Sequence, residues 1–285
     1  MSPPVIDVSP LCTTKDPSNP SVQAVAQQLR DAFSSWGLIQ ITGHQIPSSL
    51  QQDIHILRCS KTFFDLPEQK KLAIDVRTGG PAWRGYMPFS GESTHGVVDR
   101  KEGVYFGPEH PATHELNGMP LHGVNQFPPD ADVPGMRDAV LKYIELITEL
   151  GKTLTMGLSM ALALDPRYMN AHLLEPEPVA LFRFFMYPPN EIGASGGSGI
   201  GEHSDFGYLT ILAQDSPGLQ VKSPSGDWVD VPVIQDALIV NVGDMFDMLT
   251  GGRFVSPRHR ALSPPFGGPH VTRFLSSSTF LGVLP

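Results

Sequence analysis

Side chains that bind metal ions recur at an informative spacing in the second half of this 285-residue chain. His203 and Asp205 flank one small residue in GEHSDFGYLTIL, and His259 follows in GGRFVSPRHRAL, 54 positions beyond Asp205. Side chains at i and i+2 of an extended strand point the same way, so we expect His203 and Asp205 to face one ion. His259 is the candidate third ligand, because it lies in the same β-rich region and is flanked by arginines rather than by apolar residues.

Two histidines and one carboxylate favour a particular chemistry. On one face of an octahedron they leave three positions open, an arrangement that suits non-haem iron(II) and dioxygen. Zinc is more often closed by a fourth ligand or keeps one water. An H-x-D pair also arises by chance, with purely structural side chains. The later histidine followed by arginine, and Arg273 another 14 residues on, favour the metal site.

Strands must position these residues, and the sequence after residue 178 predicts at least six of them. They are VALFRFFMY, GYLTILAQ, GLQVKS, DWVDVPV, ALIVNVG and VTRFLSSSTF, with SPSGD as a hairpin signal between two of them. A jelly roll closes such a set without long exposed edges. We therefore expect an α+β fold whose core is a double-stranded β-helix (cupin-like jelly roll) with flanking helices.

The first half of the chain reads as a mixture of helices and strands. We predict strands at VIDVSPL and LIQITGH, and helices at SNPSVQAVAQQLRDAFSSWG, SSLQQDIHILRCSKTFFDL and PEQKKLAI. Residues 107–135 have no apolar period and many prolines, so they indicate a long surface connection. The longest helical pattern follows, from Met136 to Asp165-Pro166. We expect an N-terminal α/β region (1–120) packed on a unit of long helix and jelly roll (121–285), compact overall.

Composition excludes several classes of partner. The net charge is −9, and no run of lysine or arginine gives the footprint of a nucleic-acid or anionic-membrane surface. No segment reaches the roughly 18 apolar residues that cross a bilayer, and MSPPVIDVSPL lacks the features of a secretory signal. We expect a cytoplasmic protein that acts on a small molecule.

Over nearly its whole length the chain resembles the 2-oxoglutarate and iron(II)-dependent dioxygenases of the isopenicillin N synthase-like group. The specific matches are FFMYPPN, GEHSDFGYLTILAQDSPGLQV, ALIVNVGDMFDMLTGGRFVSPRHRAL and TRF; AFSSWGLIQITGHQIP, FFDLPEQKK, RGYMPFSGE and DRKEGVYFG are supportive. By this resemblance His203, Asp205 and His259 would hold Fe(II). Arg273 would bind the distal carboxylate of 2-oxoglutarate through paired hydrogen bonds. Tyr187 of MYPP would supply a hydroxyl to that carboxylate, or be a strand-end tyrosine with a wet tip.

The resemblance also implies a reaction. Such an enzyme oxidises a C–H bond of a small organic metabolite, most often by hydroxylation, while O2 is consumed and 2-oxoglutarate loses carbon dioxide to become succinate; ascorbate commonly supports it. Specialised metabolism is the expected setting. Alternatives are an Fe(II) oxidase of the same fold, in which Arg273 would bind a substrate carboxylate without 2-oxoglutarate, a binding protein that lost turnover, and a zinc hydrolase. All three ligands are present, which disfavours the binding protein, and no H-E-x-x-H motif supports the hydrolase.

Three departures from the group's pattern matter. The group usually has R-x-S, whereas Ser276 comes one step late after Arg273, and on a strand one step means the opposite face unless a bulge intervenes. Gln45 stands where glycine is more usual, which we expect to affect only a turn. The sequence ends at Pro285, where relatives often continue into a helix over the substrate mouth, so we expect a mouth that is more open or covered by another segment.

Most other candidate residues are expected to have structural roles. Asp244 is expected to organise a turn or to hydrogen-bond a metal ligand. The aromatics of RGYMPF and DRKEGVYFG (Tyr86, Tyr105 and Phe106) could line a pocket or pack in the core. We expect the remaining histidines to be structural or solvated; they are His44, His55, His95, His110, His114, His122, His172 and His270.

Overall fold

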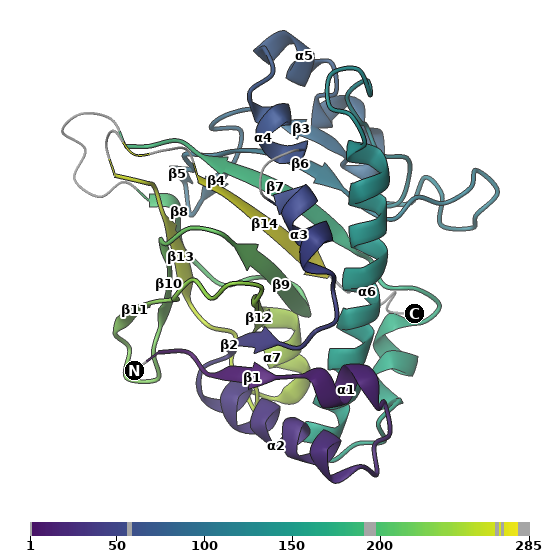
Figure 1. Cartoon of the computed structure of the whole chain (residues 1–285), viewed down its shortest axis with the longest axis vertical. Coiled ribbons are helices and arrows are strands. Elements are labelled where there is room, and N and C mark those ends of the chain that lie inside the picture. Colours follow the sequence, from purple (N-terminus) through teal and green to yellow (C-terminus); the bar gives the residue numbers. More distant parts are fainter. Residues whose placement is uncertain (1, 56–58, 191–197, 266–267, 269–270, 279–285) are drawn as a thin grey trace.

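Two β-sheets lie face to face in the part of the chain that the computed structural model describes, residues 2–55, 59–190, 198–265, 268 and 271–278; for 52–55, 198 and 271–278 this is the backbone alone. Figure 1 shows the larger sheet between the helices and the smaller sheet. The smaller sheet lies on the side of strands β9 (Leu209–Gln214) and β12 (Leu238–Val242) that faces away from the long helix α6 (Met136–Ala161). This double-sheet arrangement confirms the predicted jelly roll with flanking helices.

The larger sheet has eight strands, and each neighbouring pair is antiparallel except the parallel pair β1–β2. In spatial order the strands are β1 (Val5–Asp7), β2 (Leu38–Thr42), β12 (Leu238–Val242), β9 (Leu209–Gln214), β14 (Val271–Ser278), β7 (Leu181–Tyr187), β6 (Glu102–Phe106) and β3 (Gly85–Met87). Strands from both halves of the sequence therefore form one sheet.

The smaller sheet is antiparallel and is built from four strands of the second half. Their order is β11 (Trp228–Asp230), β10 (Leu219–Lys222), β13 (His259–Leu262) and β8 (Ser198–His203). The SPSGD segment joins β10 to β11, which confirms the predicted hairpin. A short hairpin of β4 (Ser93–Thr94) and β5 (Val97–Val98) lies against β8.

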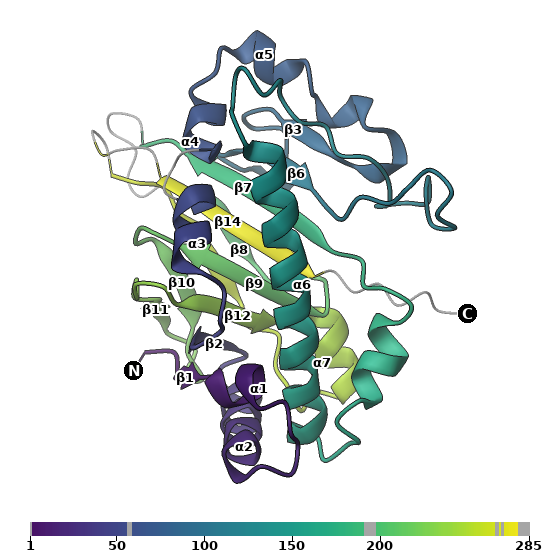
Figure 2. The same cartoon turned by 45° about the vertical axis from the view of Figure 1, so that its right-hand side comes forward.

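Helices cover the outer face of the larger sheet, and α6 (Met136–Ala161) runs across it (Figure 2). The predicted residues Val140, Ile144, Ile147 and Leu150 are buried on α6. The other helices are α1 (Ser9–Thr13), α2 (Pro20–Ser35), α3 (Ser48–His55), α4 (Cys59–Phe64), α5 (Glu68–Leu72) and α7 (Asp244–Thr250), with single turns η1 (Val76–Thr78), η2 (Gly80–Ala82) and η3 (Asn170–Leu174).

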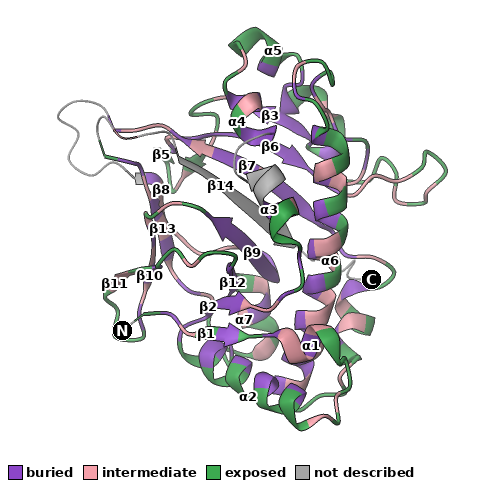
Figure 3. Ribbon diagram, viewed as in Figure 1, coloured by how far each residue is buried: buried purple, intermediate pink, exposed green. Residues whose placement is uncertain are grey.

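Apolar residues divide the interior into layers. The largest cluster lies between the helices and the larger sheet, and it includes Phe182 and Phe184 of β7. Their neighbour Phe185 belongs instead to a small cluster between the two sheets, because successive side chains of a strand point to opposite faces. A second small cluster between the sheets surrounds Leu212 and Val221. Figure 3 shows the result: β9 and β12 are buried along their whole length.

Most predicted elements are present, with shifts at their ends. Asn19 caps α2 by accepting a hydrogen bond from the Ser21 amide. The helix predicted over residues 48–66 corresponds to α3 and α4, and residues 56–58 between them lie outside the described part. The sequence patterns did not predict β3, β6, β8 or β13. Gln45 adopts a left-handed conformation (φ 63°), which explains why glycine is usual in this turn.

Gly37, between α2 and β2, anchors the segment that leads to β13. It has φ +65°, and a Cβ there would lie 1.9 Å from the carbonyl oxygen of Val255. The Val255 amide also donates to the Phe33 carbonyl at 3.0 Å. The end of α2 and the approach to His259 are therefore in close backbone contact.

We predict that Gly37→Ala destabilises the protein by about 2–4 kcal/mol, the sum of left-handed strain and overpacking. Gly251→Ala is the matched control, because Gly251 has φ +62° and open space around it; it should lose only the strain, about 1 kcal/mol. Urea unfolding followed by circular dichroism measures both losses. Equal losses of unfolding free energy in the two variants would mean that residues 255–257 move away from the new Cβ at little cost.

Candidate metal centre

The three predicted ligands come together at one end of the smaller sheet. His203 is the last residue of β8 and His259 the first of β13, and the two are direct cross-strand partners with ring centroids 4.2 Å apart. Oδ1 of Asp205 lies 3.8 Å from Nε2 of His203 and 3.7 Å from Nε2 of His259. One ion with bonds of about 2 Å could contact all three after small side-chain rotations.

Backbone carbonyls fix which imidazole nitrogen is available. Nδ1 of His203 lies 2.8 Å from the carbonyl of Gly201, and Nδ1 of His259 lies 3.1 Å from that of Pro257. A carbonyl only accepts, so each Nδ1 carries a proton, and Nε2 is the nitrogen of each ring that is left to bind an ion. Histidines that bind metals are oriented in this way.

Neighbouring residues keep the carboxylate of Asp205 ionised and orient it. Burial would raise the pKa of Asp205, but nearby His259 and hydrogen bonds from Asn241 and Thr210 hold that pKa below its usual value. The Asn241 amide donates to Oδ2 at 2.8 Å, so Oδ1 is left to face the histidines. Burial, with His259 beside it, lowers the pKa of His203 to about 4. At neutral pH the site therefore offers a neutral imidazole at His203 and a carboxylate anion at Asp205, with the imidazole of His259 beside them, a donor set that fits Fe(II).

Asp205 is not on a strand with His203, and the prediction of two ligands on one extended strand was wrong in this respect. β8 ends at His203, and Asp205 lies in the following loop. The loop is bound to the start of α7, where the Asp244 amide donates to the carbonyl of Asp205 at 2.7 Å. Gly243 permits this approach, because a Cβ there would lie 2.2 Å from the carbonyl oxygen of Gly207.

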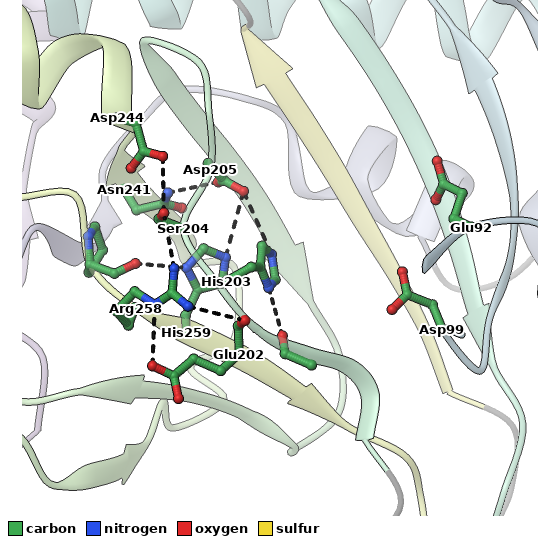
Figure 4. A network of polar contacts seen from close by, with 12 residues as sticks. Glu92, Asp99, Glu202, His203, Ser204, Asp205, Asn241, Asp244, Arg258 and His259 are labelled. Atoms are coloured by element: carbon green, nitrogen blue, oxygen red, sulfur yellow. Dashed lines mark hydrogen bonds and ion pairs between the residues drawn. The ribbon is translucent and has the colours of Figure 1, made fainter. Parts of the chain in front are cut away.

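A network of polar contacts holds the loop from outside, as Figure 4 shows. Oγ of Ser204 donates to the Asp244 carboxylate at 3.1 Å, so Asp244 supports the loop rather than a ligand side chain. Arg258 contacts both Oε1 of Glu202 and Oγ of Ser204. Residues next to each histidine thus bind one another, which fixes the spacing of the two strand ends.

Charged side chains from a separate segment lie on the other side of His203 (Figure 4). The buried Lys101 ammonium lies 2.9 Å from Glu92 and 3.1 Å from Asp99, and 4.5 Å above the ring of Phe185. Burial would lower the pKa of Lys101, but Tyr187, Glu92 and Asp99 together raise it, so the lysine stays charged. This Lys101 cluster was not predicted, although DRK in a region of turns could have indicated it.

The predicted 2-oxoglutarate residues lie on the larger sheet. Tyr187 ends β7, is buried, and packs over Gly199, where a Cβ would lie 2.4 Å from its ring. The backbone of Arg273 pairs with Phe185 and Gln214; its side chain lies outside the described ones. Ser276 pairs with Phe182 in the same uninterrupted register. No bulge therefore interrupts β14 between Arg273 and Ser276.

The remaining candidates have structural surroundings. Tyr86 hydrogen-bonds Glu102 and Phe106 packs in the main core, whereas Tyr105 lies between the sheets beside Phe185. His44 is buried with its Nε2 2.8 Å from the carbonyl of Asp236. The side chains of His55 and His270 lie outside the described part of the chain.

Models of protein families match both halves of the chain. Residues 3–130 match the non-haem dioxygenase in morphine synthesis N-terminal family, and residues 176–280 match the 2OG-Fe(II) oxygenase superfamily. Among the described residues, no helix is long and apolar enough to span a membrane.

Curated proteins and solved structures agree with these matches. A probable iron/ascorbate oxidoreductase of Dictyostelium discoideum is 34% identical, with 90% of this chain and 76% of the relative covered. The 2-oxoglutarate-dependent dioxygenase thnC of Trichoderma harzianum is 32% identical, with 94% and 82% covered. The crystal structure of a full-length Neurospora crassa protein in complex with alpha-KG superposes with a TM-score of 0.80 at 24% identity, covering 96% of this chain and 84% of that one.

Fold and donor set together define a non-haem iron oxygenase with a jelly-roll core. The chain belongs to the 2OG-Fe(II) oxygenase superfamily and is a 2-oxoglutarate-dependent dioxygenase. Its cofactor and cosubstrates are Fe(II), 2-oxoglutarate and O2.

Asn241 is the residue of this site that the metal-ligand spacing did not predict, and it can be tested. We predict that Asn241→Ala weakens Fe(II) binding about 10–100-fold, because Asp205 loses one of the hydrogen bonds that orient it. His259→Ala, which deletes a ligand, should bind no iron at concentrations that saturate the parent. Anaerobic equilibrium dialysis measures both, with the exposed Asn117→Ala as control. Parental affinity in Asn241→Ala would contradict the role of this amide.

Proposed function

We propose that His203, Asp205 and His259 bind the Fe(II) of this dioxygenase and that Arg273 and Tyr187 bind the distal carboxylate of 2-oxoglutarate. We further propose that the enzyme hydroxylates a C–H bond of a small organic molecule. One observation carries the assignment of the ligands. Two Nε2 atoms and one carboxylate oxygen converge from two backbone segments, residues 203–205 and the start of β13, and each of the three side chains is oriented by its own hydrogen bond.

The protein contributes binding and orientation to the reaction. Bound iron and 2-oxoglutarate supply the oxidation, in which 2-oxoglutarate and O2 yield succinate, carbon dioxide and the oxidised substrate. Three protein ligands leave room on the metal for reactants, and the ligand side chains remain partly exposed, 22% for His203 and 15% for Asp205. The apolar clusters on either side exclude bulk water from the space between the sheets.

Arg273 is proposed from its position in the sheet. Its strand partners Phe185 and Gln214 have side chains between the two sheets, in contact with Tyr187 and with the carbonyl of Val231 respectively. Lys101 lies close enough to Tyr187 for the two to interact electrostatically, and its ammonium is shared with Glu92 and Asp99. Ser276 pairs with Phe182 of the helix-facing core, which supports a cosubstrate site without the usual serine.

The substrate is proposed to be small and to carry polar groups. Glu92, Lys101 and Asp99 form a charged cluster whose ammonium interacts with His203, and such a cluster suits hydrogen-bonding groups better than a plain hydrocarbon. A relative named clavatol oxidase in Penicillium crustosum is 35% identical over 90% of this chain and 80% of its own length. Its name states a small-molecule substrate, which supports this class.

We predict that Arg273→Lys weakens 2-oxoglutarate binding about thirtyfold, or about 2 kcal/mol, because a paired contact becomes a single one. Arg260→Lys is the matched control: Arg260 lies on β13 but stacks on Trp228 and bonds Gln220. The midpoint of 2-oxoglutarate titrations of the Fe(II) enzyme, followed by succinate formation, reports the change. If the affinity is unchanged, Arg273 binds something else, such as a substrate carboxylate.

The reaction class is tested by stoichiometry. In a screen of small organic compounds with Fe(II), ascorbate and 2-oxoglutarate, a true substrate should give one succinate and one hydroxylated product per O2 consumed. Oxygen consumption with product but without succinate would contradict 2-oxoglutarate as the cosubstrate of this site.

A further inference from the structure

Two histidines and a glutamate form a second cluster in the connection between β6 and α6. The connection leaves the sheet at Gly107 and returns at Asn125, whose side chain makes hydrogen bonds to both the amide and the carbonyl of Gly107. His110 lies on the outgoing arm and His122 on the returning arm. Glu177 comes from the segment that enters β7. One ligand atom from each of these three side chains lies within 4.8 Å of the others.

His122 is oriented in the same way as the two histidines of the candidate iron site. Its Nδ1 lies 2.9 Å from the carbonyl oxygen of Pro120, two residues before it. His203 and His259 use the carbonyls of Gly201 and Pro257, also two residues before. The carbonyl requires a proton on Nδ1, so Nε2 of His122 keeps a free lone pair.

Oε1 of Glu177 is a buried acceptor that makes no hydrogen bond in the described part of the chain. Nε2 of His110 lies 2.8 Å from it as an ion-pair partner if that histidine is protonated. A buried carboxylate oxygen without a hydrogen bond is costly, and two ligand atoms this close without a hydrogen bond are expected where both bind an ion between them.

We propose that His110, His122 and Glu177 bind a second divalent transition-metal ion, for which Zn²⁺ is the probe. Two imidazoles and one carboxylate, completed by a water, are a common donor set for zinc. Neither Ca²⁺ nor Mg²⁺ suits it, since both prefer oxygen ligands. This proposal differs from the expectation from the sequence that His110 and His122 are structural or solvated.

Neighbouring residues position the cluster and set its strength. His114 stacks on His110 with centroids 4.3 Å apart, and its Nδ1 accepts from the Leu116 amide. Its Nε2 therefore carries the proton, 3.7 Å from Oε2 of Glu177, so His114 has no lone pair free for the ion and is not a ligand. The buried guanidinium of Arg84 opposes a cation. We therefore expect weaker binding than at a zinc site with four protein ligands.

The bound cation would hold β6 and β7 in place from outside the iron centre. It joins both arms of the connection to the segment that precedes β7, and it does so a few residues from the strands that carry Tyr105 and Tyr187. Its role is structural, because all three ligands lie away from His203 and His259. The proposal is independent of the function of the iron site.

Zinc content measured by mass spectrometry after dialysis against Zn²⁺ tests the proposal in the full chain. Iron-free parent protein should bind two equivalents, because zinc also occupies the first site. His259→Ala and Glu177→Gln should each bind one, and the double variant none. His172→Asn, at an exposed histidine outside both clusters, is the matched control and should keep two.

Two further measurements separate loss of the site from loss of the fold. Fe(II) content and uncoupled succinate formation should be unchanged in Glu177→Gln, which shows that the first site is intact. In the His259→Ala background, Zn²⁺ should raise the midpoint of thermal unfolding, and the Glu177→Gln substitution should abolish that rise. Two outcomes would overturn the proposal. One is a zinc content in Glu177→Gln as high as in the parent; the other is a parent that binds a single equivalent of zinc and loses it in His259→Ala.

Discussion

The cross-strand pairing of His203 with His259 is the contact on which the rest of the site depends. A register shift of one residue between β8 and β13 would turn one imidazole to the opposite face of the sheet. The pairing is enforced from both sides. β10 fixes β13 by placing buried Val221 opposite His259, and Arg258 binds Glu202 next to the other histidine. The register becomes irregular immediately after His259. β8 and β13 therefore pair directly where the two histidines lie opposite each other, and irregularly beyond that point.

A polar centre between two sheets requires that each buried polar atom has a partner. Asn241 lies in the middle of an otherwise apolar strand, and its amide is used by the Asp205 carboxylate. Glu92, Lys101 and Asp99 satisfy one another on the facing side. Apolar clusters around Leu212 and Phe185 enclose these groups. The interior is thus apolar at both ends and charged in between. Because the surroundings are apolar, electrostatic interactions are stronger there, where reactants would bind, than they are in water.

The sequence predicted the types of most elements and which three candidate ligands lie together, because both depend on local patterns. Short apolar segments rich in β-branched residues indicated β9 and β12, and the i, i+3, i+4 pattern indicated α6. β8 and β13 were missed because their sequences, SGIGEH and HRAL, are glycine-rich or charged and are held by pairing rather than by propensity. The sequence also did not indicate that β8 ends before Asp205, because that end depends on hydrogen bonds to α7, 40 residues later.

The clusters formed by distant residues were the least predictable. His110, His122 and Glu177 have no motif spacing, and Lys101 meets Glu92 only after a hairpin turns the chain back. Asn241 could have been found, because an asparagine inside an apolar strand needs a partner. The role of Arg273 came from family resemblance, and strand register supports it without describing the side chain.

The central place of β14 in the larger sheet constrains the order in which the chain can fold. β14 lies between β9 and β7, yet it follows every other strand of that sheet in the sequence. Before residues 271–278 are synthesised, β9 and β7 have unpaired edges facing each other across a gap of one strand. Such edges can pair with other chains. A nascent chain stalled before β14 is therefore the form most exposed to aggregation, and chaperone binding would matter most at that stage.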